Sequence, residues 1–162
     1  GDFDWGGIYP LQAPLVVGDE IWIYYTGYGV DHNHQPPPNV TGFPNGIGLA
    51  KLRLDGFVSV DAGATEGTLT TKPFVFGGSK LVINANAKSG QIAVEILNAD
   101  SKPLTGFSKR DCDPVQVDEI RHTITWNGKS DVTGVAGRPI KLKFYLKNAK
   151  LFSFMFPTPD RG

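Results

Sequence analysis

The sequence has one cysteine, no long apolar run and no net charge, and each of these absences removes a class of protein. Cys112 is the only cysteine in 162 residues, so no internal disulfide can hold the chain together. No apolar run approaches the roughly 18 residues that a membrane-spanning helix needs, so we expect no membrane partner. Basic and acidic residues balance at 16 each. A neutral chain has no overall field to attract nucleic acid, so none is expected as a partner.

Amphipathic helical patterns are also missing, and period-two alternation takes their place. Residues 151–156 are apolar on both faces apart from Ser153, which predicts a central strand. The 20 glycines and 12 prolines supply turns between the strands. We predict an all-β fold, a two-sheet antiparallel β-sandwich of jelly-roll type, with residues 1–162 as a single domain. The alternating runs typical of half-buried strands are residues 20–26, 81–86, 92–97, 120–126 and 141–147.

One segment, residues 29–46, breaks this pattern and is predicted to be a long loop. It contains the prolines Pro36–Pro38, which a strand interior excludes because proline has no amide hydrogen for the ladder. Long loops in compact domains are often functional. His32 and His34 would face one metal ion if they lay on a strand. Because the prolines argue against a strand, we predict no metal site there.

The motifs indicate no catalytic residues. The chain has no Gly-x-Ser-x-Gly motif and no phosphate-binding glycine loop. Glycoside hydrolysis needs two carboxylates in different environments, and nothing in the sequence marks such a pair. We predict no cofactor, with one alternative left open. That alternative is a calcium ion bound by Asp111, Asp113 and Asp118, although the EF-hand spacing is missing.

The aromatic stretch Glu20–His34 is the feature that points to a function. On a strand, Trp22 and Tyr24 face away from Ile21 and Ile23. If the isoleucine face is buried, the tryptophan face is open to solvent. The alternative is that both faces are buried, as in any central strand of a sandwich.

Exposed aromatic side chains usually mark a binding surface, and sugars suit such a surface. A sugar ring presents C–H groups that stack on a flat aromatic ring, while nearby polar side chains bond its hydroxyls. Contacts of this kind are weak, about 1 kcal/mol each, so we expect micromolar to millimolar affinity. We predict a carbohydrate-binding platform made of Trp5, Trp22, Tyr24, Tyr28, Asp31 and His32.

Two blocks of the sequence also resemble a known family. "IYPLQAPLVVGDEIWIYYTGYGVDHN" is similar to the closing segment of a five-bladed propeller of the glycoside hydrolase 32/43-like kind. "GIGLAKLRLDGFVSVDAGATEGTLTTKPFVFGG", "SGQIAVEILNADSKPLTGFSKRDCDPV" and "RHTITWNGKSDVTGVAGRPIKLKFYLKNAKLFSF" resemble the C-terminal β-sandwich that follows this propeller in bacterial glycosyl hydrolases. The second block is the more specific of the two.

The resemblance implies an accessory domain of a carbohydrate-active enzyme. The catalytic carboxylates of that family are expected on propeller blades with no counterpart here, so none is assigned to this chain. The implied partners are a poly- or oligosaccharide and an adjoining catalytic domain in a longer protein, in an extracellular or periplasmic location. The opening segment, Ile8 to Tyr28, is expected to add strands to the sandwich. Two alternatives stay open: a hydrolase fragment with its own activity, and a purely structural sandwich that braces a catalytic propeller.

Overall fold

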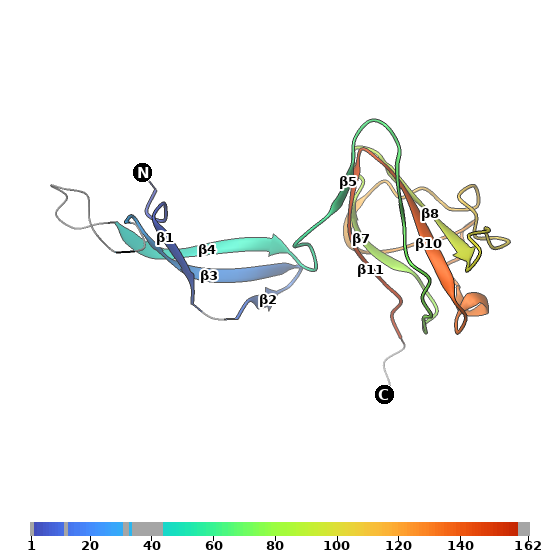
Figure 1. The fold of residues 1–162 in the computed structure, drawn as a ribbon, viewed down its shortest axis with the longest axis horizontal. Helices are drawn as coiled ribbons and strands as arrows, with labels where there is room; N and C mark the ends of the chain where they lie inside the picture. The colour runs from blue at the N-terminus through green and yellow to red at the C-terminus, as the bar shows by residue number, and fades with distance from the viewer. Residues whose placement is uncertain (1, 12, 31–32, 34–43, 159–162) are drawn as a thin grey trace. The chain divides into compact units, whose positions relative to one another are not determined.

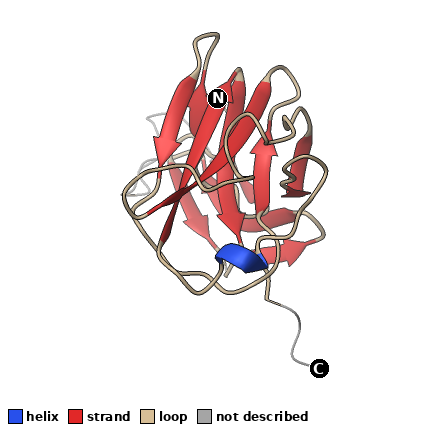
Figure 2. Cartoon of the chain, turned by 90° about the vertical axis from the view of Figure 1, so that its right-hand side faces the viewer, coloured by secondary structure: helices blue, strands red, loops and turns tan. Residues whose placement is uncertain are grey.

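The structure is a computed structural model that describes residues 2–11, 13–30, 33 and 44–158. Its regular elements are eleven β-strands and one 3₁₀ turn, and no α-helix occurs in these residues (Figures 1 and 2). The prediction of an all-β fold is therefore confirmed. The chain divides into two compact units, Gly1–Leu54 (unit 1) and Asp55–Gly162 (unit 2), which are described separately below.

Unit 1 is an antiparallel sheet built around its longest central strand, β3 (Glu20–Tyr28). One edge of β3 pairs along its whole length with β4 (Asn45–Arg53), which lies beside it in Figure 1. The other edge pairs with two short strands, β1 (Gly7–Pro10) and β2 (Leu15–Val17). Isoleucine, tryptophan and tyrosine fill β3, and such β-branched and aromatic residues favour a strand flanked on both sides.

One face of this sheet, the glycine face, carries Gly27, Gly46 and Gly48, and two aromatic rings lie over it. Phe3 stacks on Tyr25 with ring centroids 6.2 Å apart. A Cβ atom on Gly48 would lie 2.2 Å from Cζ of Tyr25, so the ring needs a glycine beneath it. The Tyr25 hydroxyl donates a hydrogen bond of 2.7 Å to Asp4 Oδ2, and this bond raises the pKa of Tyr25. The chain thus covers part of this face with its own side chains.

Unit 2 consists of two antiparallel sheets, one of three strands in the order β6-β10-β8 and one of four in the order β5-β11-β7-β9. Consecutive strands from β5 to β11 alternate between the two sheets. β11 pairs with β5 on one side and β7 on the other, which confirms the predicted central strand. The elements are β5 (Val60–Ala62), β6 (Gly67–Thr70), β7 (Val82–Asn86), β8 (Gln91–Asn98), β9 (Asp118–Thr123), η1 (Thr133–Val135), β10 (Ile140–Lys147) and β11 (Ala149–Met155).

One hydrophobic core joins these two sheets. Leu142 and Phe144 on β10 of the first sheet and Ile83 on β7 of the second are fully buried members of the same cluster. Trp126, also buried, donates its indole N–H to the Val94 carbonyl at 2.9 Å. Two sheets sealed around one core make unit 2 a two-layer β-sandwich.

A full jelly roll has eight strands, and unit 2 forms seven within the described residues. The chain between β8 and β9 instead bridges to the free edge of β8. Ile92 and Val115 exchange backbone hydrogen bonds of 3.0 and 2.9 Å, and the Leu104 amide donates to the Ile96 carbonyl at 2.9 Å. This segment lies beside β8 without becoming a strand, so the jelly-roll assignment stays a prediction.

Two expectations about residues 1–54 differ from the structure. Residues 8–28 are expected to add strands to the sandwich, but in the described residues β1, β2 and β4 each pair with β3 in a separate sheet. Both edges of β3 are filled within unit 1, which leaves no place there for a strand of the sandwich. β4 also begins at Asn45, inside the predicted loop 29–46, of which residues 31–32 and 34–43 lie outside the described residues.

Candidate functional site

The face of the unit 1 sheet opposite the glycine face carries most of its tryptophan and tyrosine side chains, and we call it the aromatic face. Trp22, Tyr24 and Tyr28 alternate along β3 and therefore share this face. Tyr9 on β1 pairs in register with Thr26 and joins them. Its ring meets the ring of Tyr28 edge-on, with centroids 5.7 Å apart. The predicted grouping of Trp22, Tyr24 and Tyr28 on one face thus has a direct geometric basis.

Tyr24 is an exposed ring of this face. Its side chain is 38% exposed, and it lines a hollow of about 270 Å³ together with Leu11, Ala13 and Leu15. These three residues come from the edge where the chain passes from β1 to β2 beside β3. The hollow combines an apolar wall with one phenol ring, which is the chemistry that receives the C–H face of a sugar.

Trp22 is anchored rather than free. Its indole N–H donates to Glu20 Oε2 at 2.7 Å. Lys51 places its Nζ 4.2 Å from the centroid of the Trp22 ring and 3.4 Å from Glu20 Oε2. The Trp22 hydrogen bond and the Lys51 ammonium together lower the pKa of the Glu20 carboxyl. The Lys51 ammonium thus covers one face of the indole, and the hollow itself is lined by Tyr24 rather than by Trp22.

Of the remaining predicted site residues, the structure describes Trp5 but not Asp31 or His32. Trp5 is 59% exposed and precedes Gly6, whose amide donates to the Tyr28 carbonyl at 2.9 Å, so its backbone lies at the Tyr28 end of the sheet. Asp31 and His32 lie outside the described residues, and their part in the site stays a prediction.

The other residues of the hollow leave no local signal in the sequence. Leu11 and Ala13 stand between β1 and β2 and Leu15 is the first residue of β2, where no strand alternation marks them. Leu49 on β4 lies directly across from Tyr24, and Ile47, 72% exposed, lies across from Thr26. Only the pairing of the strands reveals that these apolar side chains share the aromatic face.

The carboxylates considered for calcium already accept hydrogen bonds from the protein. Asp111 Oδ2 accepts from the amide and the hydroxyl of Ser108 at 3.1 and 2.6 Å. Asp113 Oδ2 accepts from Thr125 Oγ1 at 2.5 Å and from the Gly128 amide at 2.8 Å. These donors lower the pKa of both carboxyls. Within the described ranges, no group of three or more His, Cys, Asp or Glu side chains is placed to hold a metal ion.

Cys112 is a buried structural residue. Its sulfur accepts a hydrogen bond of 3.2 Å from the Val94 amide. Burial raises the pKa of the Cys112 thiol to about 11. The nucleophilic form of cysteine is the thiolate, which is scarce at neutral pH when the pKa is this high.

Comparison with known proteins adds no relative to this picture. No family model, curated protein or solved structure matches the chain. Within the part of the chain that the structure describes, no helix has the length and hydropathy of a membrane span. The function is therefore inferred from the geometry of the two units.

Proposed function

We propose that this chain is a non-catalytic accessory domain of a carbohydrate-active protein, and that the aromatic face of unit 1 binds an oligo- or polysaccharide. The supporting observation is the exposed ring of Tyr24 beside an apolar hollow, on a face that also carries Tyr9, Tyr28 and Trp22. The proposal includes the expected extracellular or periplasmic location and an adjoining catalytic domain in a longer protein.

The size and chemistry of the site fit a weak glycan contact. A hollow of about 270 Å³ is at the small end of ligand pockets, so it receives one sugar unit of a longer chain. Glu20 and Lys51 stand next to Trp22 and offer an acceptor and a donor to hydroxyl groups. Stacking on one tyrosine contributes about 1 kcal/mol. The expected dissociation constants are therefore on the order of micromolar to millimolar.

Affinity gel electrophoresis on soluble polysaccharides, followed by a glycan array, tests this proposal. The wild type is compared with Tyr24→Ala and with Phe57→Ala, which removes an exposed aromatic ring from unit 2. We expect Tyr24→Ala to weaken binding about fivefold and Phe57→Ala to leave it unchanged. Circular dichroism establishes that each variant is folded. Equal retention of wild type and Tyr24→Ala on every polysaccharide would refute the aromatic face as a glycan site.

A bracing role is the second candidate, and the aliphatic content of the aromatic face favours it. Leu15, Ile47 and Leu49 are all exposed on the same face as Tyr24. Exposed apolar patches also mark sites where another protein surface packs. Ile47→Thr keeps a β-branched side chain on β4 while making it more polar. If the bracing role is correct, wild type associates with itself or with a partner in sedimentation experiments, Ile47→Thr does so less, and glycan arrays stay blank for both.

A hydrolytic role can be distinguished from binding with the same protein and polysaccharides. Polysaccharides that bind to the chain are incubated with it, and release of reducing ends is measured. We expect none, because no carboxylate of the described residues lines the hollow beside Tyr24. Sustained release that scales with protein concentration would replace the binding proposal with a catalytic one.

A further inference from the structure

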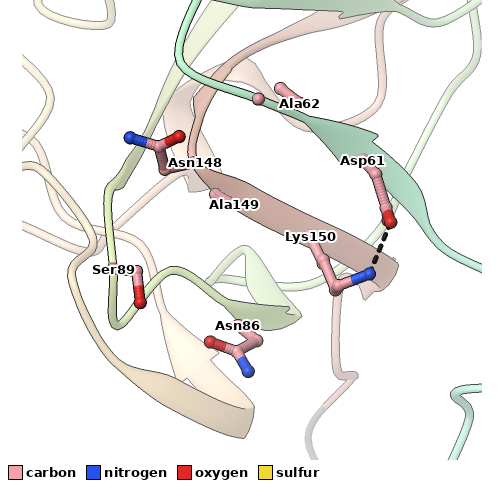
Figure 3. A pocket seen from close by; sticks show the side chains of 8 residues that line it. Asp61, Ala62, Asn86, Ser89, Asn148, Ala149 and Lys150 are labelled. Atoms are coloured by element: carbon pink, nitrogen blue, oxygen red, sulfur yellow. Dashed lines mark hydrogen bonds and ion pairs between the residues drawn. The ribbon is translucent and has the colours of Figure 1, made fainter.

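Unit 2 has a hollow of about 460 Å³ (Figure 3). Its lining is mostly polar, unlike that of the hollow beside Tyr24 in unit 1. Its side chains come from β5, β7 and β11 and from the turns at Ser89 and Asn148. The largest apolar side chain in its lining is alanine. The hollow therefore offers hydrogen-bonding groups and no ring on which a ligand can stack.

Strand register places a row of polar side chains across one wall. Lys150 on β11 pairs with Asp61 on β5 and with Asn86 on β7, so all three project from the same face of the sheet. Lys150 Nζ lies 2.5 Å from Asp61 Oδ2. The Lys150 ammonium and the Ser59 hydroxyl lower the pKa of Asp61, which keeps it ionised. The pair presents both an acceptor and a donor with no net charge.

Three polar groups around the hollow have no protein partner within the described structure. Asn86 accepts a 3.3 Å hydrogen bond from the Lys88 amide through Oδ1, which leaves its side-chain NH₂ unpaired. Within the described residues, the Asn148 side-chain amide and the Ser89 hydroxyl make no hydrogen bond to the protein. Figure 3 shows Asn148 and Ser89 on one side of the hollow, the Asp61–Lys150 pair on the other, and Asn86 between Ser89 and Lys150.

The turns that carry these groups are held in place by the backbone. The Asn148 amide donates to the Gly63 carbonyl at 2.8 Å. Asn148 itself has a φ of 45°, in the left-handed region that asparagine and glycine tolerate best. A Cβ atom on Gly90 would lie 1.9 Å from the Lys147 carbonyl oxygen, so the turn after β7 packs closely against the turn before β11. The backbone of both turns is therefore fixed, while the exposed Ser89 and Asn148 side chains remain accessible to a ligand.

We propose that this polar hollow is a second saccharide-binding site, which takes one neutral sugar unit through its hydroxyl groups. Side-chain amides donate and accept at adjacent atoms, which matches neighbouring hydroxyls on a sugar ring. The neutral ion pair adds a charged acceptor and a charged donor without favouring an ionic ligand. The site shares no residue with the aromatic face. Loss of binding at one site therefore leaves the proposal for the other site unaffected.

The test is an NMR titration of the ¹⁵N-labelled full chain with the methyl glycosides of glucose, galactose, mannose, xylose and N-acetylglucosamine. We expect at least one glycoside to shift the side-chain NH₂ signals of Asn86 and Asn148 saturably, with millimolar affinity. Asn148→Gly removes the amide and keeps the left-handed backbone, so the fold is retained. We expect this variant to bind at least fivefold more weakly.

Asn127→Gly is the matched control, because Asn127 also has a left-handed φ, of 50°, and lies in a turn outside this hollow. It should bind like the wild type. The proposal is overturned if no glycoside shifts the Asn86 and Asn148 signals, or if Asn148→Gly binds as tightly as the wild type. Shifts confined to Tyr9 and Tyr24 would refute the polar site and support the aromatic one. If the Asn148 side-chain signal of Tyr24→Ala titrates with the same affinity as in the wild type, the polar site binds independently of the aromatic face.

Discussion

Both units are built from antiparallel strands, yet unit 2 buries most of its apolar side chains and unit 1 leaves most of its large ones exposed. All the buried hydrophobic residues of the described structure belong to unit 2, apart from Ile21 and Val30. Most of the exposed large hydrophobic side chains belong to unit 1. The difference shows that period-two alternation produces a core only when a second sheet faces the first.

The difference also separates the unit that holds the hydrophobic core from the unit that carries the aromatic face. Unit 2 has a closed core and displays mainly polar groups around its hollow, whereas unit 1 leaves apolar and aromatic side chains uncovered. Exposed apolar surface costs stability and is retained where something binds to it.

Truncating the core of unit 2 should have the largest effect on folding. Phe144 is fully buried, and its ring centroid lies 5.5 Å from that of Phe154. We expect Phe144→Ala to lower the free energy of unfolding by about 3–5 kcal/mol, because it leaves a cavity that the sandwich cannot close. Urea denaturation followed by Trp126 fluorescence, in a background with Trp5 and Trp22 changed to phenylalanine, measures it.

Phe57→Ala serves as the control because Phe57 is exposed in the same unit. It should change the free energy of unfolding by no more than about 0.5 kcal/mol. Equal losses in the two variants would contradict the assignment of unit 2 stability to its core.

Hydrogen exchange should separate the two units directly. Backbone amides in β3 and β4 are covered by few buried side chains, whereas those in β8 and β10 lie over the core. We expect the paired amides of β8 and β10 to exchange about 100-fold more slowly than those of β3 and β4. Mass spectrometry of peptides from each unit measures the rates. Matching rates would mean that unit 1 has a core of its own.

Gly48→Ala should disturb unit 1 without touching unit 2. The added methyl would lie 2.2 Å from Tyr25 Cζ, so the ring and its partner Phe3 must move. We expect a loss of about 1–3 kcal/mol in unit 1, with a change in the tyrosine signal in near-ultraviolet circular dichroism. Gly63→Ala is the control, because nothing lies within 4 Å of its added Cβ. An unshifted signal in Gly48→Ala would show that Tyr25 does not rest on the sheet.

The Cys112 thiol should make the stability of unit 2 depend on pH in the alkaline range. Its pKa is about 11 in the folded chain, above the value of about 8.5 for an unfolded thiol. Its contribution to stability is therefore complete below about pH 8.5 and is lost as the pH rises through 11, because the unfolded state loses its proton first. Urea titrations between pH 8 and 11 should show a shallower decline for Cys112→Ala than for the wild type. Rapid reaction of the native thiol with Ellman's reagent at pH 8 would contradict its burial.

The sequence predicts those parts of the fold that leave a local pattern. Alternation around Trp22 and Tyr24 identifies β3, and the two-faced apolar run from Leu151 identifies β11 as an internal strand. Alternation does not reveal β4, because the small residues Gly46, Gly48 and Ala50 occupy every second position. Rings lie over Gly46 and Gly48, so these two positions need glycine.

The site is less visible in the sequence because it depends on partners that are far apart along the chain. Nothing near Trp22 shows that Lys51 covers its ring, since only the β3–β4 register brings them together. The same holds for Lys150, which lies between Asp61 and Asn86 through pairings that span most of unit 2. Residue types can be recognised locally, but their juxtaposition is a property of the sheet.

The position of β11 has a consequence for how the sandwich comes into being. It is the last strand of unit 2 in chain order, yet it lies between β5 and β7, which have no bond to each other across it. During synthesis on the ribosome, the earlier strands must wait for residues 149–155 to emerge before the four-stranded sheet can close. A nascent chain halted just before Ala149 would hold two loose edges, so chaperones that shield such edges should stay bound until this final strand is released.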